Sequence, residues 1–362
     1  MKSKIAIPIV TFCLTIVTLG CGGYTATPTA TSLSGFEQTN LVSDTAGSAA
    51  HTDPGLINPW GIAFGPNQPF WIVDNNSGRA KVFDPTGAPQ IPLAIGIPTP
   101  ANSASKPTGV VFNPITEDFQ VSGTPAQFLF ATEDGIVSTW SEINGNLPSS
   151  ATVALNNSAA GAAYKGLAIL TPDCCREFLA LADFHDGSIA TYNIGFDLLA
   201  APGTFTDPNL PSGYAPFNIQ QIDDKVFITY AVQDAAKHDP VIGAGNGIVD
   251  IFDREGNFVR RFASNGPLNA PWGITKASAN FGPFSNAILI GNFGDGTIHA
   301  FDQSTGNLVG TLKDRSGNVI TNPGLWALVF RADGIGASNT LYLTAGSSNE
   351  NHGLFAAISF HN

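Results

Sequence analysis

Gly78-Arg-Ala-Lys-Val-Phe-Asp84 contains the pattern that decides the fold. A glycine opens a short β-type run, the fifth residue after it is aromatic, and a small polar residue ends the run. The pattern starts six times, and its large fifth residue is aromatic in every copy but the last, where it is Ile358. The copies begin at Gly78, Gly135, Gly187, Gly247, Gly296 and Gly353. A repeat of about fifty to sixty residues with several strands per period predicts a six-bladed β-propeller.

Each period contains short runs of β-branched and aromatic residues bounded by Gly, Pro, Asn and Asp, which predicts a blade of four strands. In the first period we expect strands at 60–64, 70–73 and 80–83 and a fourth near Ile91. The first strands of the other blades are expected at 108–112, 166–170, 217–222, 272–276 and 326–330. Their second strands are expected at 127–131, 178–181, 226–230, 287–290 and 340–343.

The sixth period lacks a fourth strand, because the sequence ends soon after the third strand at 354–360. The segment 37–43 precedes the first blade and has no other partner in the repeat pattern. We therefore expect it to pair with 354–360 and close the ring, which would cover a free sheet edge.

Two stretches carry a resemblance to a known repeat. Asn58-Pro-Trp-Gly-Ile-Ala63, with Trp71-Ile-Val-Asp74, resembles an NHL-type repeat, and Ala270-Pro-Trp-Gly-Ile274 matches it again. Blades three and four depart, because Tyr164-Lys-Gly166 lacks the proline and Tyr214-Ala-Pro-Phe217 lacks the glycine. The whole is also similar to an exported bacterial family of six-bladed propellers known as conserved hypothetical proteins. The resemblance implies a fold and leaves the activity open.

The first residues have the pattern of an export signal. Lys2 and Lys4 precede an apolar stretch of about fifteen residues that ends near Gly20-Cys21. We read residues 1–20 as a lipoprotein-type signal peptide, 21–35 as a Thr/Ala/Pro-rich tether and 36–362 as the propeller. Cys21 would then carry the lipid, and Gly22 favours the outer membrane of a periplasmic or cell-surface lipoprotein. Ordinary secretion is the alternative.

The excess of acidic residues limits the kinds of partner that we expect for this chain. The chain has 16 Lys and Arg against 28 Asp and Glu, and removal of the signal would take away two further positive charges. Nucleic acid is therefore not expected as a partner, because its phosphates need a basic surface. A membrane is expected only through the lipid anchor. Cys174 and Cys175 would form either a vicinal disulfide or two free thiols.

Polar residues gather where one face of the ring would form. Loops between second and third strands, and loops entering first strands, meet on that face in a propeller. They contain Asp74, Glu133, Asp134, Asp183, His185, Asp186, Asp234, His238, Asn292, Asp295, Asn349, Glu350 and His352, with Trp60, Lys106, Lys165, Tyr214 and Trp272 at the strand entries. The loop 234–243 is the longest of them and could act as a lid, although variable loops are common in propellers.

From this set we predict a site at the mouth of the central channel. The candidate ligand-binding residues are Trp60, Asp74, Asp183, His185, His238, Trp272, Asn292 and His352. Asp74, Asp183 and Asn292 are the candidate metal ligands, since oxygen donors suit calcium or magnesium, while the histidines would allow zinc. The alternative is that Asp and Asn before a glycine only form turns.

Three functions remain open at this point. A binding module for a small polar ligand, a carbohydrate or an envelope protein needs no catalytic set. A metal-dependent hydrolase or lactonase would use a divalent cation at the channel mouth to activate water. A structural envelope protein is the third. Established catalytic motifs such as Gly-x-Ser-x-Gly and His-Glu-x-x-His are absent from the sequence, so catalytic residues stay unassigned.

Overall fold

The computed structural model describes residues 34–90, 94–100, 104–173, 176–200, 203–331, 333–334 and 336–362. The predicted signal peptide, Cys21, residues 22–33 of the predicted tether and residues 174–175 lie outside these ranges. Among the described residues, no helix has the length and apolar character that crossing a membrane requires.

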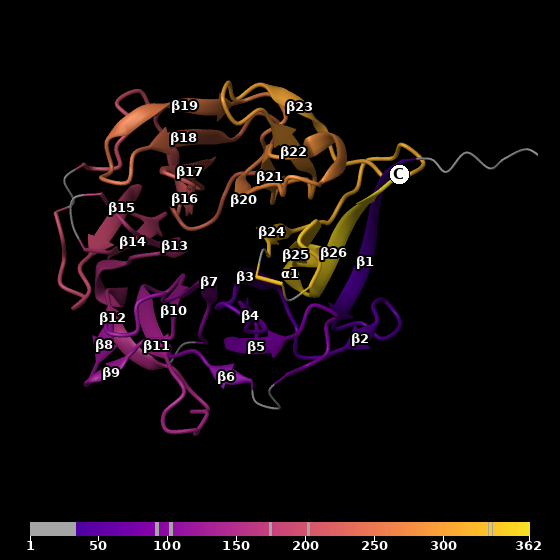
Figure 1. Cartoon of the computed structure of the whole chain (residues 1–362). Helices are drawn as coiled ribbons and strands as arrows, with labels where there is room; N and C mark the ends of the chain where they lie inside the picture. Colours follow the sequence, from indigo (N-terminus) through magenta and orange to yellow (C-terminus); the bar gives the residue numbers. More distant parts are fainter. Residues whose placement is uncertain are drawn as a thin grey trace, which may run out of the picture. The chain divides into compact units, whose positions relative to one another are not determined.

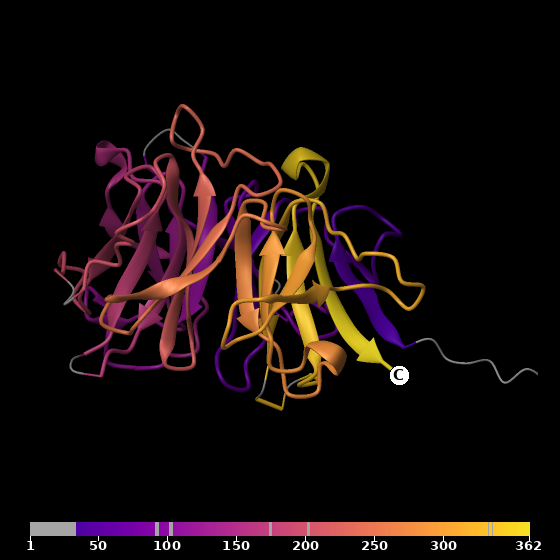
Figure 2. The same ribbon diagram turned by 90° about the horizontal axis from the view of Figure 1, so that it is seen from above.

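Six sheets, antiparallel apart from the parallel β1–β2 pair, stand around a common axis as the blades of a propeller (Figures 1 and 2). Blade 1 contains β3 (Pro59–Ala63), β4 (Phe70–Asp74), β5 (Arg79–Phe83) and β6 (Ile95–Gly96). Blade 2 contains β7 (Pro107–Phe112), β10 (Phe128–Thr132), β11 (Ile136–Trp140) and β12 (Thr152–Asn156), with a small hairpin of β8 (Gln120–Val121) and β9 (Thr124–Pro125). Blade 3 contains β13 (Tyr164–Leu170), β14 (Phe178–Asp183) and β15 (Ser188–Tyr192).

The second half of the ring has the same plan. Blade 4 contains β16 (Tyr214–Ile222), β17 (Lys225–Val232), β18 (Ile248–Phe252) and β19 (Phe258–Ser264). Blade 5 contains β20 (Pro271–Lys276), β21 (Ile288–Asn292), β22 (Ile298–Phe301) and β23 (Leu308–Thr311). Blade 6 contains β24 (Leu325–Phe330), β25 (Thr340–Ala345), β26 (Leu354–His361), β1 (Gly35–Ser43) and β2 (His51–Thr52). The helical segments are α1 (Ser347–Glu350) and the 3₁₀ turns Ser158–Ala160 and Gly282–Phe284.

The ring closes as the sequence predicted. β1 pairs antiparallel with β26, from Gly35 opposite His361 to Ser43 opposite Leu354, with one irregularity near Asn40. The ring of Phe36, on β1, packs 5.2 Å from that of Phe360 and 4.8 Å from that of Phe281 in blade 5. The closing strand therefore completes blade 6 and also joins the apolar core between blades 5 and 6.

Blade 3 differs from the expected four strands. In the described residues its last strand is reduced to a single bridge between Tyr192 and Leu198. The chain then turns away, and the amides of Gly203 and Phe205 donate to carbonyls of the Glu255–Gly256 turn in blade 4. This segment's hydrogen bonds therefore go to the neighbouring blade instead of to its own sheet. In blade 1 the position expected for the fourth strand, near Ile91, lies outside the described residues, and the described fourth strand is β6 at Ile95–Gly96.

The repeated glycine has a physical cause. Gly78 and Gly135 have φ of 66° and 76°, a left-handed conformation that L side chains rarely adopt. At Gly247, by contrast, a Cβ would come within 2.6 Å of Leu268 Cβ and 2.7 Å of Pro271 Cδ. The same sequence signal thus has two origins, a tight turn at four of the six glycines and close approach of neighbouring atoms at Gly247 and Gly353.

The first strand of each blade lies next to the axis. These inner strands contact one another in the cyclic order β3, β7, β13, β16, β20 and β24, and β24 contacts β3. Each forms one edge of its own sheet. The close packing requires small residues, since a Cβ on Gly61 of β3 would lie 2.9 Å from the carbonyl oxygen of Thr108 on β7. The inner strands therefore enclose a narrow central channel.

Candidate functional site

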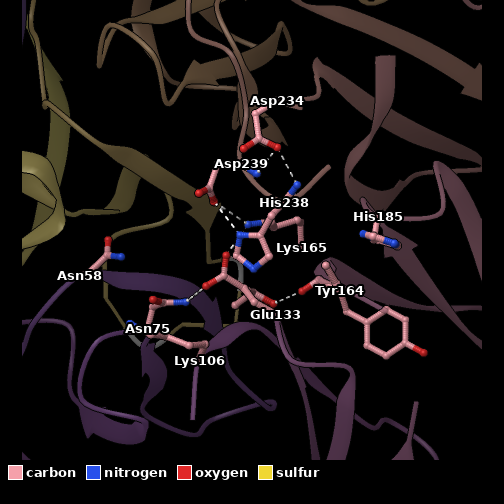
Figure 3. Close-up of polar contacts among 12 residues, drawn as sticks. Asn58, Asn75, Lys106, Glu133, Tyr164, Lys165, His185, Asp234, His238 and Asp239 are labelled. Atoms are coloured by element: carbon pink, nitrogen blue, oxygen red, sulfur yellow. Dashed lines mark hydrogen bonds and ion pairs between the residues drawn. The ribbon is translucent and has the colours of Figure 1, made fainter. Parts of the chain in front are cut away.

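A cluster of charged side chains lies at the end of the channel where the inner strands begin (Figure 3). Its base is the ion pair between Lys165, the second residue of β13, and Glu133, which follows β10. The side chains of Lys165 and Glu133 are only 1% and 9% exposed. Lys165 Nζ donates to Glu133 Oε1, and Asn75 Nδ2 donates to Glu133 Oε2 at 2.8 Å. We call this end of the channel the charged mouth.

The loop between β17 and β18 adds two titratable groups to the charged mouth. His238 Nδ1 lies 3.0 Å from Asp239 Oδ1, and the same carboxylate oxygen lies 3.4 Å from Lys165 Nζ. Asp234 holds the loop by accepting from the His238 backbone amide at 2.8 Å. The hydrogen bond to Asp239 raises the pKa of His238, and the same bond lowers the pKa of Asp239 to about 2. The pair is therefore an imidazole held beside an ionised carboxylate.

Glu350 reaches the charged mouth from blade 6 through an unusual turn. Ser348, Asn349 and Glu350 all have positive φ, at 54°, 54° and 65°. Positive φ is uncommon for residues other than glycine, and here three such residues follow one another. Asn76 Nδ2 donates to the Glu350 carbonyl at 2.6 Å, and Lys106 Nζ donates to Asn76 Oδ1 at 2.6 Å.

The electrostatic environment of Glu350 is unfavourable for its charged form. Burial, followed by repulsion from the carboxylates of Glu133 and Asp239, raises the pKa of Glu350 to about 7, although Lys165 and Lys106 act in the opposite direction. The carboxyl groups of Glu133, Asp239 and Glu350 therefore interact electrostatically close to the ammonium groups of Lys165 and Lys106.

Tryptophans separate the charged mouth from the rest of the channel. Trp60 and Trp326 stack with ring centroids 3.6 Å apart, and Trp272 meets both edge-on. Trp272 Nε1 donates to the Lys165 carbonyl at 2.8 Å, so the indole of blade 5 is fixed against blade 3. Lys165 Nζ lies 5.4 Å from the centre of the Trp60 ring and 5.9 Å from that of Phe184. We call Trp60, Trp272 and Trp326 the tryptophan plug.

The structure places the predicted ligand-binding residues in three different settings. Trp60 and Trp272 lie at the axis but are 2% and 4% exposed, beneath the charged mouth. His238 belongs to the charged mouth itself. His185 lies apart from Glu133 and His238 (Figure 3), and His352 pairs with Asp44 at 2.7 Å, beyond β1.

Asp74, Asp183 and Asn292 are each bound within their own region. Asp183 Oδ1 accepts from the amides of Ala163, His185 and Asp186 at 3.1–3.2 Å. Asn292 Oδ1 accepts from the Asn269 amide at 3.1 Å, and its Nδ2 donates to the Pro267 carbonyl at 2.7 Å.

Asp74 is fully buried, with Oδ2 3.8 Å from Lys81 Nζ. Burial raises the pKa of both Asp74 and Asp183. The contacts of the three candidate metal ligands are thus turn-forming or local, and a shared metal role stays a prediction.

A different set has the geometry for a cation. One donor atom each from Glu133, His238 and Asp239 lies within 4.8 Å of the others. Sequence reasoning placed Glu133, Lys165, His238 and Glu350 on this face, but it chose only His238 as a candidate site residue and did not single out Asp239. Lys165 did carry a signal, because it precedes Gly166 as Trp60 precedes Gly61 and Trp272 precedes Gly273. Blades 1 and 5 have tryptophan at this position, so the lysine of blade 3 departs from the repeat pattern next to the channel axis.

Comparison with known proteins gives both relatives and fold neighbours. No family model matches the chain. It is 34% identical over 328 residues to "Uncharacterized protein R648" of Acanthamoeba polyphaga mimivirus, covering 88% of this chain and 78% of that protein. It is 32% identical over 302 residues to "Uncharacterized protein L690" of the same virus, covering 80% and 77%.

Solved structures show the fold alone, because their sequences are only 11–13% identical. A structural genomics protein of unknown function from Bacteroides thetaiotaomicron has a TM-score of 0.57 and covers 91% of this chain and 76% of its own. The apo form of the soluble aldose sugar dehydrogenase from Escherichia coli has a TM-score of 0.52, covering 90% and 99%. A streptogramin B lyase has a TM-score of 0.51, and the match covers 90% of this chain and 97% of the lyase. The fold is an NHL-type six-bladed propeller.

Proposed function

Since this chain belongs to the family of the mimivirus proteins R648 and L690, whose names assign no activity, we propose its function from the charged mouth. We propose that the propeller is a binding module for a small polar ligand held at this mouth. The observation that carries the proposal is the nearly buried Lys165–Glu133 pair, with His238, Asp239 and Glu350 around it.

The convergence of these charged groups favours a small ligand over a protein surface. Lys165 and Glu133 are almost inaccessible, whereas His238 and Asp239 are 47% and 67% exposed at the rim. A ligand would have to enter past the rim to reach the buried pair. Protein interfaces are broad and flat by comparison, and small-molecule sites are concave with a few convergent polar groups.

Stability alone gives little reason to keep this arrangement. Desolvation of two charges offsets much of their attraction, so a buried ion pair is weak evidence for stability. Three successive strained residues at 348–350 add a further cost, on the order of 1 kcal/mol each. These charged groups are held in arrangements that cost free energy, and they converge on one point. Both observations support a binding role.

The chemistry of the mouth indicates the ligand's groups. Carboxylate oxygens of Glu133, Asp239 and Glu350 accept hydrogen bonds, while Lys106 and His238 can donate them. A ligand with hydroxyl or amino groups on one side and an acceptor on the other would satisfy both sets. Carbohydrates and amino compounds meet this requirement.

A melting-temperature screen tests the proposal. The protein would be heated with a panel of monosaccharides, amino acids, polyamines and dicarboxylates. We expect at least one compound to raise the melting temperature of the wild type and not of Glu133→Gln. Glu117→Gln is the matched control, because it makes the same change at an exposed position of the same blade. The proposal fails if no compound stabilises the wild type or if Glu133→Gln responds equally.

A second candidate is a metal-dependent hydrolase or lactonase. Its support is the Glu133, His238 and Asp239 donor set, which could hold calcium, magnesium or zinc. A divalent cation there would polarise a carbonyl oxygen and activate water. The Lys165 ammonium opposes this candidate, because it already contacts both carboxylates and would repel a second cation.

Metal analysis distinguishes the two candidates. Calcium, magnesium and zinc would be added in turn to the chelator-treated protein, and the bound metal would be measured after dialysis. The hydrolase requires one equivalent that is lost in Asp239→Asn and kept in Asp224→Asn, an exposed control. Loss in Asp183→Ala or Asn292→Ala instead would support the ligands predicted from sequence.

We also propose export and anchoring through Cys21. The support is the sequence alone: two lysines, an apolar stretch and Gly20-Cys21. A binding module or a structural envelope protein on a tether would both suit this location. Expression in a bacterium with radiolabelled palmitate should label the wild type and not Cys21→Ser. Equal labelling, or none, would contradict the anchor.

A further inference from the structure

The other end of the channel holds a cavity that the proposed function does not use. Its volume is about 410 Å³, and the inner strands of all six blades line it. The lining includes Ile62, Phe112, Ile169, Gln220, Thr275 and Val329. These residues lie toward the ends of the inner strands, whereas the charged mouth lies at their beginnings. We call this space the lower cavity.

The lower cavity is closed toward the charged mouth. Trp272 lines it and is also part of the tryptophan plug. Trp326 is 1% exposed and stacks on Trp60 on one side and on Phe293, 4.2 Å away, on another. The plug leaves a blind cavity, so a polymer cannot thread through the ring.

The chemistry of the lower cavity differs from that of the charged mouth. In the described part of the chain, the residues that line it carry no charge. Ile62, Phe112, Ile169 and Val329 supply apolar surface. Asn218, whose Nδ2 donates to the Trp272 carbonyl at 2.9 Å, supplies a fixed amide at the plug. The inner strands are sheet edges, which present backbone N–H and C=O groups.

We propose that the lower cavity is a second binding site, for an uncharged small molecule that combines apolar surface with several hydrogen-bonding groups. Its volume lies in the range of small-molecule sites. An ion or charged ligand would lose its hydration there without gaining an opposite charge. The volume and the closed end favour a small molecule over a chain that threads the ring.

The uncharged dye N-phenyl-1-naphthylamine is a direct probe, because it fluoresces in apolar surroundings and accepts energy from tryptophan. Trp272 lines the cavity, so excitation of tryptophan should give saturable dye emission at one dye per chain. The double variant Val111→Phe/Val329→Phe fills the cavity, and we expect it to weaken dye binding at least tenfold. Val309→Phe, on an exposed outer strand, is the matched control and should leave the affinity unchanged.

Further variants keep the test decisive. If the double variant does not fold, Thr275→Lys places a charge in the cavity and should have the same effect. Glu133→Gln should bind the dye as the wild type does, since the charged mouth lies beyond the plug. The proposal is overturned if saturable emission is absent, if the cavity variants bind equally well, or if Glu133→Gln abolishes binding.

Discussion

The two ends of the central channel are built from different parts of the same repeat. The lower cavity is lined by the inner strands themselves, and its described lining is uncharged. The charged mouth is built mainly from loops, with Glu133 after β10, Asp239 in the loop after β17 and Glu350 in α1. The regular part of the repeat therefore makes the neutral end, and the parts that vary between blades make the charged end.

The charged residues of the mouth come from blades whose sequences depart from the repeat pattern. Blades 1 and 5, which match the NHL-type pattern best, supply Trp60 and Trp272 to the plug. Blade 3 has Lys165 at the corresponding position. The blades whose sequences depart from the repeat pattern are therefore the ones in which a functional site is expected.

The largest loss of stability is expected from truncating the tryptophan plug, which separates the charged mouth from the lower cavity. Trp326→Ala should lower the free energy of unfolding by about 3–5 kcal/mol, because a large buried aromatic side chain leaves a cavity. Urea unfolding followed by circular dichroism measures this loss. Val309→Ala, at an exposed position, should change stability by less than about 0.5 kcal/mol. A Trp326→Ala loss as small as that of the control would mean that the plug is not part of the core.

The next effect concerns the buried charges of the mouth. Lys165→Met leaves the Glu133 carboxylate buried without its cation, and should cost about 3 kcal/mol of unfolding free energy. Lys165→Met/Glu133→Gln removes both charges and should recover most of this loss. The double-mutant cycle in urea gives the coupling between the two residues. Additive losses would show that the two charges do not depend on each other.

A smaller effect should appear as a dependence on pH. The pKa of Glu350 is raised to about 7 from an ordinary 4.5, so the folded protein takes up this proton before the unfolded chain does. The stability of the wild type relative to Glu350→Gln should therefore rise as the pH falls from about 8 to about 4.5. We expect a change on the order of 1 kcal/mol, because water still screens the group. Parallel pH profiles of the two proteins would contradict the raised pKa.

The sequence predicted the fold better than the site. Repeat spacing identified the blades, and the missing fourth strand of blade 6 identified the closing strand, because both are properties of chain order. His238 was predicted on the correct face and lies in the charged mouth. Glu350 was placed on this face but not chosen as a site residue, and Asp239 was not singled out, since their positions depend on the path of the 234–243 loop and on three left-handed residues at 348–350. The local roles of Asp183 and Asn292 follow from backbone amides whose positions the sequence does not reveal.

Isothermal titration calorimetry tests the central claim most directly, using the compound that gives the largest melting-temperature shift. We expect one site per chain, with affinity at least about tenfold weaker in Glu133→Gln and within about twofold of wild type in Glu117→Gln. Equal affinities for the wild type and Glu133→Gln would place the ligand elsewhere and contradict the assignment of the charged mouth as the binding site.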